Sequence, residues 1–306
     1  MKRYWKEWGW LRMNPLEMSK WLLPGLLAGL GGCGLIVELA SERRLWQKNS
    51  RDFYEEKKRK VPPLGGIPFL FLLIVFILWA KTWYMLPAVL IGLVGTLDDL
   101  MKLGINGISR PLKAREKIVL QILIGILGAY LWGRTSSLWE VVWVVVVFMA
   151  VVNSTNMTDG IDSLLAMTSI VALLFSMLLL PGYGAVFFML LGFLIGFLWF
   201  NAHPADIFMG DTGAFAIGGV LATIFLRSNM EWYLLLIGIV FVLETLSVIL
   251  QVVYFKKTGR RIFLMSPIHH HFQKMGWSEP QIVFRFTFFQ TLGGMIAVVI
   301  AYVVAK

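Results

Sequence analysis

Seven aspartates occur in the 306-residue chain, and six of them fall in three short stretches beside apolar runs. The six are Asp98 and Asp99 in "LVGTLDDLMK", Asp159 and Asp162 in "NSTNMTDGID", and Asp206 and Asp211 in "FNAHPADIFMGDTG". Carboxylates with nearby amides and hydroxyls offer the oxygen ligands that suit Mg²⁺ and polar substrates. Any one of these aspartates is equally well a helix cap or a solvated loop residue. Six together favour a shared polar cavity.

The stretch "NSTNMTDGID" repeats a polar residue at every third position, namely Asn153, Asn156, Asp159 and Asp162. Residues three apart on an α-helix differ by about 300°, so the four side chains would span about half of the circumference. We therefore predict one polar helical face at the end of a span. Gly160 either permits a close backbone approach or marks a turn.

Lysines occur close to the same stretches, with Lys58 in "KKRKVPPLGG" and Lys102 in "DDLMK". Lysine binds phosphate as a point charge, and Mg²⁺ in proteins is typically held by one or two carboxylates together with substrate phosphates. A basic run beside a membrane is also a topology signal. With the aspartates, these lysines indicate an enzyme that handles a diphosphate at a membrane surface.

Three consecutive histidines, His269, His270 and His271, occur in "SPIHHHFQKMGW". Neighbouring side chains on a helix or strand point in different directions, so we do not expect the three to bind one zinc ion. Beside Lys274, imidazoles are suited to hydrogen bonding with anionic oxygens, and a structural role for at least one of them is equally open.

The elements that must position these residues are membrane helices. The chain is 58% hydrophobic and 15% charged, with a mean hydropathy of +0.73, which excludes an ordinary water-soluble protein. We predict an all-α polytopic membrane protein with a single domain over residues 1–306. The apolar stretches of spanning length number about ten, near residues 21–40, 65–80, 82–97, 117–133, 138–152, 164–181, 183–200, 213–226, 232–254 and 285–304. The single cysteine, Cys33, excludes an internal disulfide.

The basic residues predict the orientation of the chain. Segments 41–60, 99–117 and 255–285 hold 19 of the 28 Lys and Arg, so the positive-inside rule makes them cytoplasmic. The basic N-terminal tail opposes this orientation. The aspartate stretches then share the cytoplasmic side, where we predict an active-site cleft. A net charge of +10 suits topology and anionic lipid or substrate, and no nucleic acid is expected as a partner.

Four motifs occur in order along the chain: "NSTNMTDGIDSL", "FNAHPADIFMGDTGAFAIGG", "FVLETLSVILQV" and "SPIHHHFQKMGWSEPQIVFRF". Over residues 58–286 the chain resembles the phospho-N-acetylmuramoyl-pentapeptide transferases (MraY), within the polyprenyl-phosphate N-acetylhexosamine-1-phosphate transferase superfamily. The resemblance implies an enzyme of the bacterial plasma membrane with Mg²⁺ as cofactor. Such an enzyme moves phospho-MurNAc-pentapeptide from UDP-MurNAc-pentapeptide to undecaprenyl phosphate, which forms lipid I and releases UMP. The oligomeric state stays open, with a homodimer as one possibility.

The resemblance also assigns residues. The catalytic positions match Asp98, Asp99 and Asp211, with Asp211 as the metal ligand. The substrate-binding positions match Lys58, Lys102, Lys117, Asn153, Asn156, Asp159, Asp162, Asn201, Phe208, His269, His270 and His271. Phe208 would stack on uracil.

Asp98 is the candidate base, or the residue that positions the lipid phosphate. A phosphate oxygen of the lipid could attack the sugar-bearing phosphorus directly, and a two-step route through an aspartyl-phosphate is also open. The chain departs from the family at "VPPLGG", where Thr-Pro-Thr-Met-Gly-Gly is usual, so Val61 and Pro63 replace two hydroxyl-bearing residues.

Three other interpretations are compatible with the sequence. A transferase for UDP-GlcNAc or another UDP-sugar would share the catalytic aspartates but would not be expected to carry "HHHFQKMGW". A divergent paralogue would explain "VPPLGG". A transporter would place ionisable groups near the bilayer midplane, and Glu244 in the ninth apolar stretch is the one acid that fits, although packing against another helix explains it equally.

Overall fold

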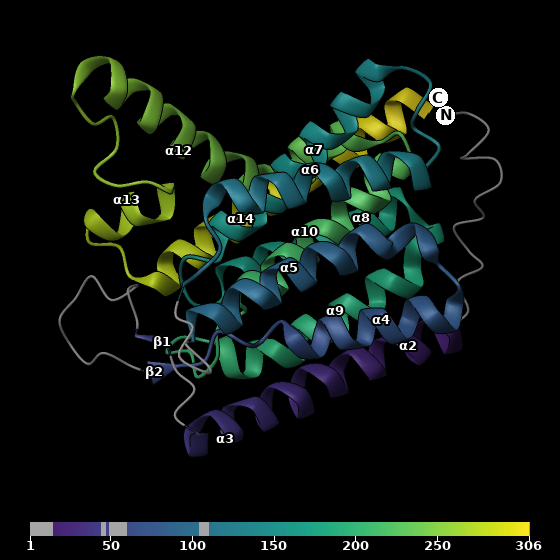
Figure 1. Cartoon of the computed structure of the whole chain (residues 1–306), viewed down its shortest axis with the longest axis horizontal. Coiled ribbons are helices and arrows are strands. Elements are labelled where there is room, and N and C mark those ends of the chain that lie inside the picture. Colours follow the sequence, from purple (N-terminus) through teal and green to yellow (C-terminus); the bar gives the residue numbers. More distant parts are fainter. Residues whose placement is uncertain (1–14, 44–46, 49–59, 104–109, 306) are drawn as a thin grey trace.

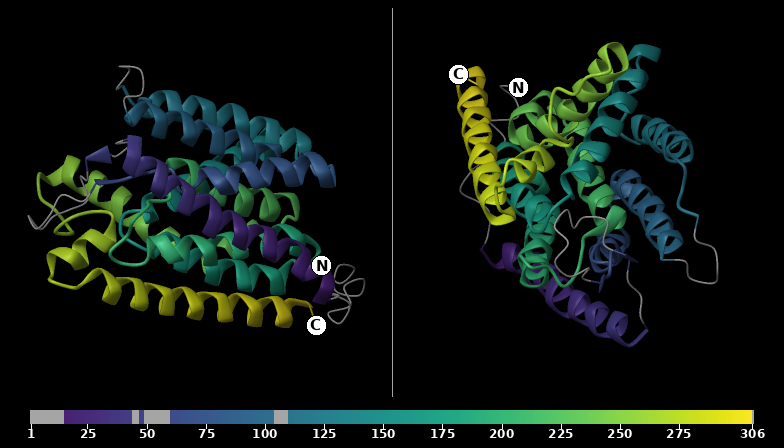
Figure 2. Two further views of the ribbon diagram at one scale, coloured as in Figure 1. Left: turned by 90° about the horizontal axis from the view of Figure 1, so that it is seen from below. Right: turned by 90° about the vertical axis from the view of Figure 1, so that its left-hand side faces the viewer.

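The computed structural model describes residues 15–43, 47–48, 60–103 and 110–305. In this part of the chain, helices lie side by side along the long axis of the molecule (Figures 1 and 2). The long helices are α2 (Pro15–Leu27), α3 (Cys33–Arg43), α4 (Ile67–Ala80), α5 (Leu86–Lys102), α6 (Ala114–Leu131), α7 (Leu138–Thr158), α8 (Leu164–Leu179), α9 (Gly184–Asn201), α10 (Gly210–Arg227), α12 (Ile239–Thr258) and α14 (Glu279–Ala305). A π-helical turn, η1 (Ala28–Gly32), joins α2 to α3.

Short elements complete the fold. The 3-10 turns η2 (Trp83–Met85) and η4 (Pro181–Tyr183) precede the long helices α5 and α9. A third, η5 (Glu231–Tyr233), precedes the short helix α11 (Leu234–Ile237), and α13 (Ile268–Lys274) is also short. Two-residue strands β1 (Gln47–Lys48) and β2 (Lys60–Val61) pair antiparallel, with Gln47 opposite Val61.

Each predicted apolar stretch corresponds to a helix, and the all-α multi-pass fold is confirmed, but the count of ten spans is not. Within the described ranges, six helical segments are long and apolar enough to cross a membrane: residues 20–41, 83–102, 138–158, 181–201, 239–258 and 279–304. Helices α4 and α8 are apolar but shorter. Helix α6 begins with the charged run "REK", and α10 carries Asp211 in its first turn and Arg227 in its last, and neither helix is among the six segments.

Helix α10 is the core of the bundle and packs against α5 and α7. Its side chains are buried without interruption from Thr212 to Leu226, so its neighbours are other helices. Glycine and alanine along α10 allow these helices to come close. Near the start of α10, the Thr155 hydroxyl of α7 donates to the Ala214 carbonyl at 2.9 Å. The packing therefore fixes where Asp211, in the first turn of α10, lies relative to the ends of α5 and α7.

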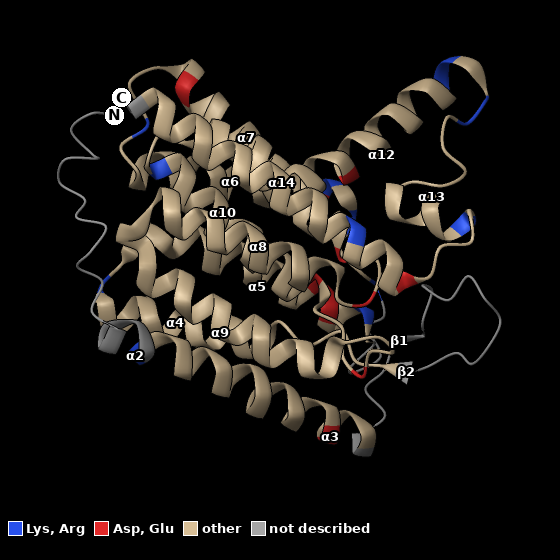
Figure 3. Cartoon of the chain, turned by 180° about the vertical axis from the view of Figure 1, so that it is seen from behind, with Lys and Arg blue, Asp and Glu red and all other residues tan. Residues whose placement is uncertain are grey.

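Helix α12 leaves the bundle after Gly238, which separates it from α11. Its last turns project outward, and the chain returns through α13 to α14 (Figure 1). Coloured by charge, much of the ribbon's Asp, Glu, Lys and Arg lies towards the end of the bundle that carries β1, β2 and α13 (Figure 3). The outer faces of the helices instead expose large apolar side chains such as Phe71, Trp79 and Trp199, which suits contact with lipid.

Candidate active site

Two lysines and two aspartates form a compact ionic cluster where α5 ends and α10 begins. Lys102 Nζ lies 2.8 Å from Asp98 Oδ2 and 3.2 Å from Asp211 Oδ1. Lys117 Nζ, from the first turn of α6, lies 2.7 Å from Asp98 Oδ2 and 2.6 Å from Asp211 Oδ2. Each ammonium therefore bridges the same two carboxylates. Asp98 is fully buried, whereas the lysine side chains are 24% and 20% exposed and can be reached by a substrate.

Asp99, although adjacent to Asp98, makes different contacts. Its Oδ1 accepts the main-chain N–H of Asp211 at 3.1 Å. Its Oδ2 accepts both the main-chain N–H of Thr212 at 2.8 Å and the Thr212 hydroxyl at 2.7 Å. A carboxylate is favourable at a helix N-terminus, where main-chain N–H groups are unsatisfied by the helix itself. Asp99 thus holds the first turn of α10, and with it Asp211, against α5.

Gly210 makes this close approach possible. Its φ is +73°, and a Cβ added there would lie 2.1 Å from the Pro63 carbonyl oxygen and 2.6 Å from Asp99 Oδ2. Any larger residue would be strained and would push the start of α10 away from Asp99. The motif "GDTG" therefore requires its first glycine.

The loop "VPPLGG" lies beside the segment that leads into α10. The Phe208 N–H donates to the Pro62 carbonyl at 3.0 Å, and the N–H groups of Gly65 and Gly66 donate to the carbonyls of Phe208 and Met209, each at 2.9 Å. These contacts use main-chain atoms. The departure from the family pattern therefore leaves the support for Asp211 intact.

The prediction of one helical face for the Asn-Asp series is wrong for Asp162. Helix α7 ends at Thr158, and Asp159 caps it with non-helical backbone angles. The chain then turns at Gly160, so Asp162 lies in the loop before α8 and points to other partners. The 3.6-residue period holds only while the helix continues.

The two asparagines of the series differ in their contacts. Asn153 exchanges hydrogen bonds with Gln121 of α6, at 3.2 and 2.8 Å. The Asn156 side chain is half-buried and makes no hydrogen bond to a described residue. Asn156 is thus the member of the pair with amide groups still available to a ligand.

The two residues that match nucleoside-binding positions are buried within the loop framework. Asn201 Oδ1 accepts the Ser163 N–H at 2.9 Å, and Asn201 Nδ2 donates to the Ile207 carbonyl at 2.8 Å. Phe208 is 6% exposed and packs with Val61. Asn201 therefore also joins two loops, and little of the Phe208 ring is exposed for stacking.

The three consecutive histidines bind three different partners. His269 is fully buried, with Nδ1 3.0 Å from Glu244 Oε2 of α12. His270 Nδ1 lies 2.6 Å from Gln273 Oε1, and His271 Nδ1 accepts the Leu264 N–H at 3.1 Å. The buried His269 ring also packs on the turn after α7, since a Cβ added at Gly160 would lie 2.1 Å from His269 Nε2.

Sequence reasoning did not pair Glu244 with His269. The signal was a lone acid within an apolar run, because a buried carboxylate requires a partner. Packing against another element, one of the two explanations considered, agrees with this contact.

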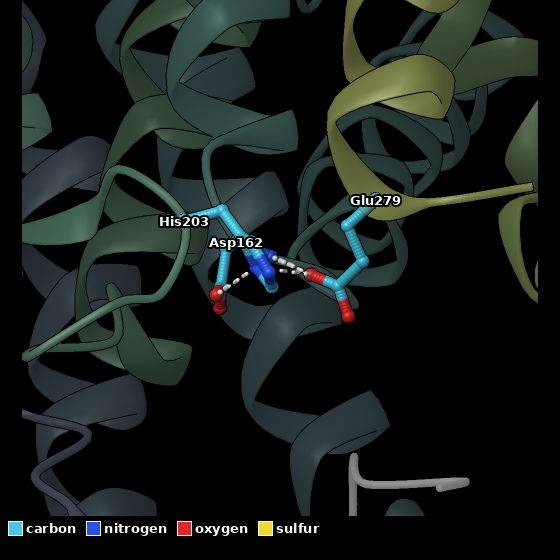
Figure 4. Close-up of side chains that lie close together, drawn as sticks. All are labelled: Asp162, His203 and Glu279. Atoms are coloured by element: carbon cyan, nitrogen blue, oxygen red, sulfur yellow. Dashed lines mark hydrogen bonds and ion pairs between the residues drawn. The ribbon is translucent and has the colours of Figure 1, made fainter.

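His203 and Glu279 were also missed, and they meet the predicted residue Asp162 at the edge of the site (Figure 4). His203 Nδ1 lies 3.0 Å from Asp162 Oδ2 and 3.6 Å from Glu279 Oε2. Lys58 lies outside the described residues. The described site as a whole offers exposed ammonium groups, carboxylate oxygens and imidazoles, which can bind a diphosphate together with a divalent cation.

Known proteins match most of the chain. A family model described as glycosyl transferase family 4 matches residues 82–229. A Dictyoglomus turgidum protein named phospho-N-acetylmuramoyl-pentapeptide-transferase is 41% identical, over 75% of this chain and 80% of its own length. A protein of the same name from Lacticaseibacillus paracasei is 41% identical, over 76% of this chain and 82% of its own. Another, from Oceanobacillus iheyensis, is 37% identical, over 80% of this chain and 85% of its own.

Proposed function

The chain belongs to the phospho-N-acetylmuramoyl-pentapeptide transferase family, and we propose that it transfers phospho-MurNAc-pentapeptide from UDP-MurNAc-pentapeptide to undecaprenyl phosphate. The products are lipid I, a precursor of peptidoglycan, and UMP. The protein acts in the bacterial cell membrane, with its site on the cytoplasmic side. The excess of Lys and Arg in segments 41–60, 99–117 and 255–285 supports that orientation.

The observation that carries the proposal is the pair of ammonium groups that bridge Asp98 and Asp211. In the reaction, a phosphate oxygen of the lipid attacks the sugar-bearing phosphorus, and negative charge grows on the departing UMP. Lys102 and Lys117 are held in place before substrate binds and can offset that charge. The residues therefore supply positioning and electrostatic stabilisation, which suits direct attack by the lipid phosphate.

Asp98 is better suited to positioning than to proton transfer. Its Oδ2 accepts from both lysines, and its Oδ1 accepts the Leu112 N–H at 2.7 Å. A carboxylate surrounded by cationic donors is a weak proton acceptor. A lipid phosphate monoester is already largely ionised near neutral pH, so the attacking oxygen needs little help from a base. We therefore assign Asp98 to holding the two lysines.

We assign Mg²⁺ to Asp211. Both Asp98 and Asp211 touch the same Lys117 ammonium, so their oxygens are close together, and Asp211 is partly exposed. Two carboxylates beside a substrate diphosphate form the hard oxygen donor set that Mg²⁺ takes. When bound, the ion supplies further neutralisation of phosphate charge.

Of the remaining family positions, Asn156, Asp159 and His270 are proposed to bind the donor. A homodimer stays a prediction. The transporter alternative requires Glu244 to reach a water-filled path, whereas the Glu244 and His269 side chains are both 0% exposed. This contact favours the enzyme.

The test is an assay of UMP release by the purified full-length protein with undecaprenyl phosphate and Mg²⁺. UDP-MurNAc-pentapeptide and UDP-GlcNAc are compared as donors, with Asp211→Asn as the inactive control. We expect UMP only with the first donor. Preference for UDP-GlcNAc would move the protein to another branch of the superfamily, and no turnover with either donor would favour a divergent paralogue.

A further inference from the structure

Three side chains from distant parts of the chain lie close together. Asp162 lies in the loop between α7 and α8, His203 in the loop between α9 and α10, and Glu279 begins α14. One ligand atom from each lies within 4.8 Å of the other two, and the His203 ring lies between the carboxylates of Asp162 and Glu279 (Figure 4). This Asp-His-Glu cluster is separate from the carboxylates that contact Lys102 and Lys117.

We propose that the Asp-His-Glu cluster binds a divalent transition-metal ion, Zn²⁺ being the best fit. Zinc bonds to nitrogen and carboxylate oxygen are about 2.0–2.2 Å, so tetrahedral ligands are about 3.3–3.5 Å apart. The observed separations from His203 Nδ1, 3.0 Å to Asp162 Oδ2 and 3.6 Å to Glu279 Oε2, lie on either side of that value. Bound metal would take the place of the proton that otherwise links the imidazole to a carboxylate.

The chemistry of the ligands selects the type of ion. An imidazole nitrogen suits zinc and other transition metals, whereas Mg²⁺ prefers oxygen alone. His203 is 46% exposed, which leaves a path for the ion and a fourth coordination position for water. The site therefore differs in preference from the one assigned to Mg²⁺ at Asp211.

The carboxylates are held in place before any ion binds. Asp162 Oδ2 accepts the Ala205 N–H at 3.0 Å. Glu279 Oε2 accepts the Asp162 N–H at 3.1 Å, and its Oε1 accepts from Gln273 Nε2 at 3.1 Å. Such second contacts orient metal ligands and reduce the cost of assembling a site.

A bound ion would join three segments that are far apart in the sequence. These are the loop that follows the Asn-Asp series, the loop that leads to Asp211 and the junction between the histidine helix α13 and α14. The ion would thus stabilise the loops against one another. The inference goes beyond the proposed transfer reaction, since metal binding can be measured without substrate.

The experiment measures zinc binding to the full-length protein in detergent after chelator treatment. Titration with ZnCl₂ in excess MgCl₂, followed by calorimetry and metal analysis, should give one Zn²⁺ per chain. His203→Ala and Glu279→Gln should each weaken binding by about tenfold or more. His271→Ala is the matched control: it removes a nearby imidazole outside the cluster and should leave the affinity unchanged. Zinc should also raise the melting temperature of the wild type but not of His203→Ala.

Several results would overturn the proposal. If the wild type binds no stoichiometric zinc, the metal site is refuted, and His203 only contacts the two carboxylates. An equal loss of zinc affinity in His271→Ala would assign the ion to the three consecutive histidines of α13. If His203→Ala fails to fold, Co²⁺ replaces Zn²⁺ and visible absorption of the tetrahedral ion is compared between wild type and Glu279→Gln. An identical spectrum in the two proteins would refute the site.

Discussion

Asp99 and Asp211 are in direct contact, yet isosteric replacements should affect the protein in different ways. Asp99 accepts three hydrogen bonds from the first turn of α10, through both of its oxygens. Asparagine has the same shape but a single acceptor oxygen. In either orientation, the amide NH₂ of Asp99→Asn must face a main-chain N–H, which is also a donor.

The size of the effect follows from the contacts. With its oxygen towards Thr212, the asparagine keeps two bonds and loses the one from the Asp211 N–H. In the other orientation it loses the bond from the Thr212 N–H, because the Thr212 hydroxyl can accept from the amide. A hydrogen bond to a charged group contributes about 1.5–3 kcal/mol, so the loss of one such bond in Asp99→Asn should lower the free energy of unfolding by about 1.5–3 kcal/mol. Asp211→Asn should cost less, because both lysines keep Asp98 and access to solvent.

The measurement is thermal unfolding of the full-length chain in detergent, paired with UMP release. Thr212→Val is a matched control, since it removes only the hydroxyl bond to Asp99. The expected order of melting temperatures is Asp211→Asn close to wild type, Thr212→Val lower, and Asp99→Asn lowest. If Asp99→Asn has the melting temperature of the wild type but loses turnover, Asp99 acts on the substrate, and the proposal that it holds the first turn of α10 against α5 is wrong.

Three further predictions concern catalysis. Asp211→Asn should reduce UMP release by about a hundredfold or more, since the metal ligand is lost, and near-normal turnover with unchanged Mg²⁺ dependence would contradict this role. Lys117→Met should lower kcat by about 100- to 1,000-fold, because its charge acts chiefly in the transition state, and a change confined to KM would exclude that assignment. His270→Ala should raise the KM for the donor more than for the lipid phosphate. If both substrates' constants stay within about twofold, or about 0.4 kcal/mol, His270 only stabilises α13.

The helices could be predicted because apolar runs of spanning length leave few alternatives. The clustering of aspartates at one end of the bundle could also be predicted, since motifs at the ends of neighbouring spans must meet on one side of a membrane. The count of ten spans was not confirmed, because α4 and α8 are shorter than the six long apolar segments and because α6 and α10 are not among those segments. Helix α10 is enclosed by protein, so close packing through small residues determines its sequence more than lipid does.

Side-chain pairing could be predicted less well, because it depends on packing between distant segments. Asp162 is 41 residues from His203 and 117 from Glu279, and no local period relates the three. That Glu244 has a partner was easier to predict, since a lone buried acid requires one. Only the return of the chain through α13 identifies that partner as His269.

The adjacent aspartates show where sequence reasoning could have gone further. Neighbouring residues on a helix point about 100° apart, so Asp98 and Asp99 cannot make the same contacts. Asp98 Oδ2 lies 2.8 Å from Lys102 Nζ, whereas Asp99 Oδ1 lies 3.8 Å from it and Asp99 accepts its hydrogen bonds from α10. The side of α5 against which α10 packs decides which of the two aspartates contacts α10. Gly210 determines how closely the start of α10 approaches α5. The pair "DD" therefore implied that the two aspartates differ in their contacts. Which of them contacts α10 could be assigned only from the packing of α10.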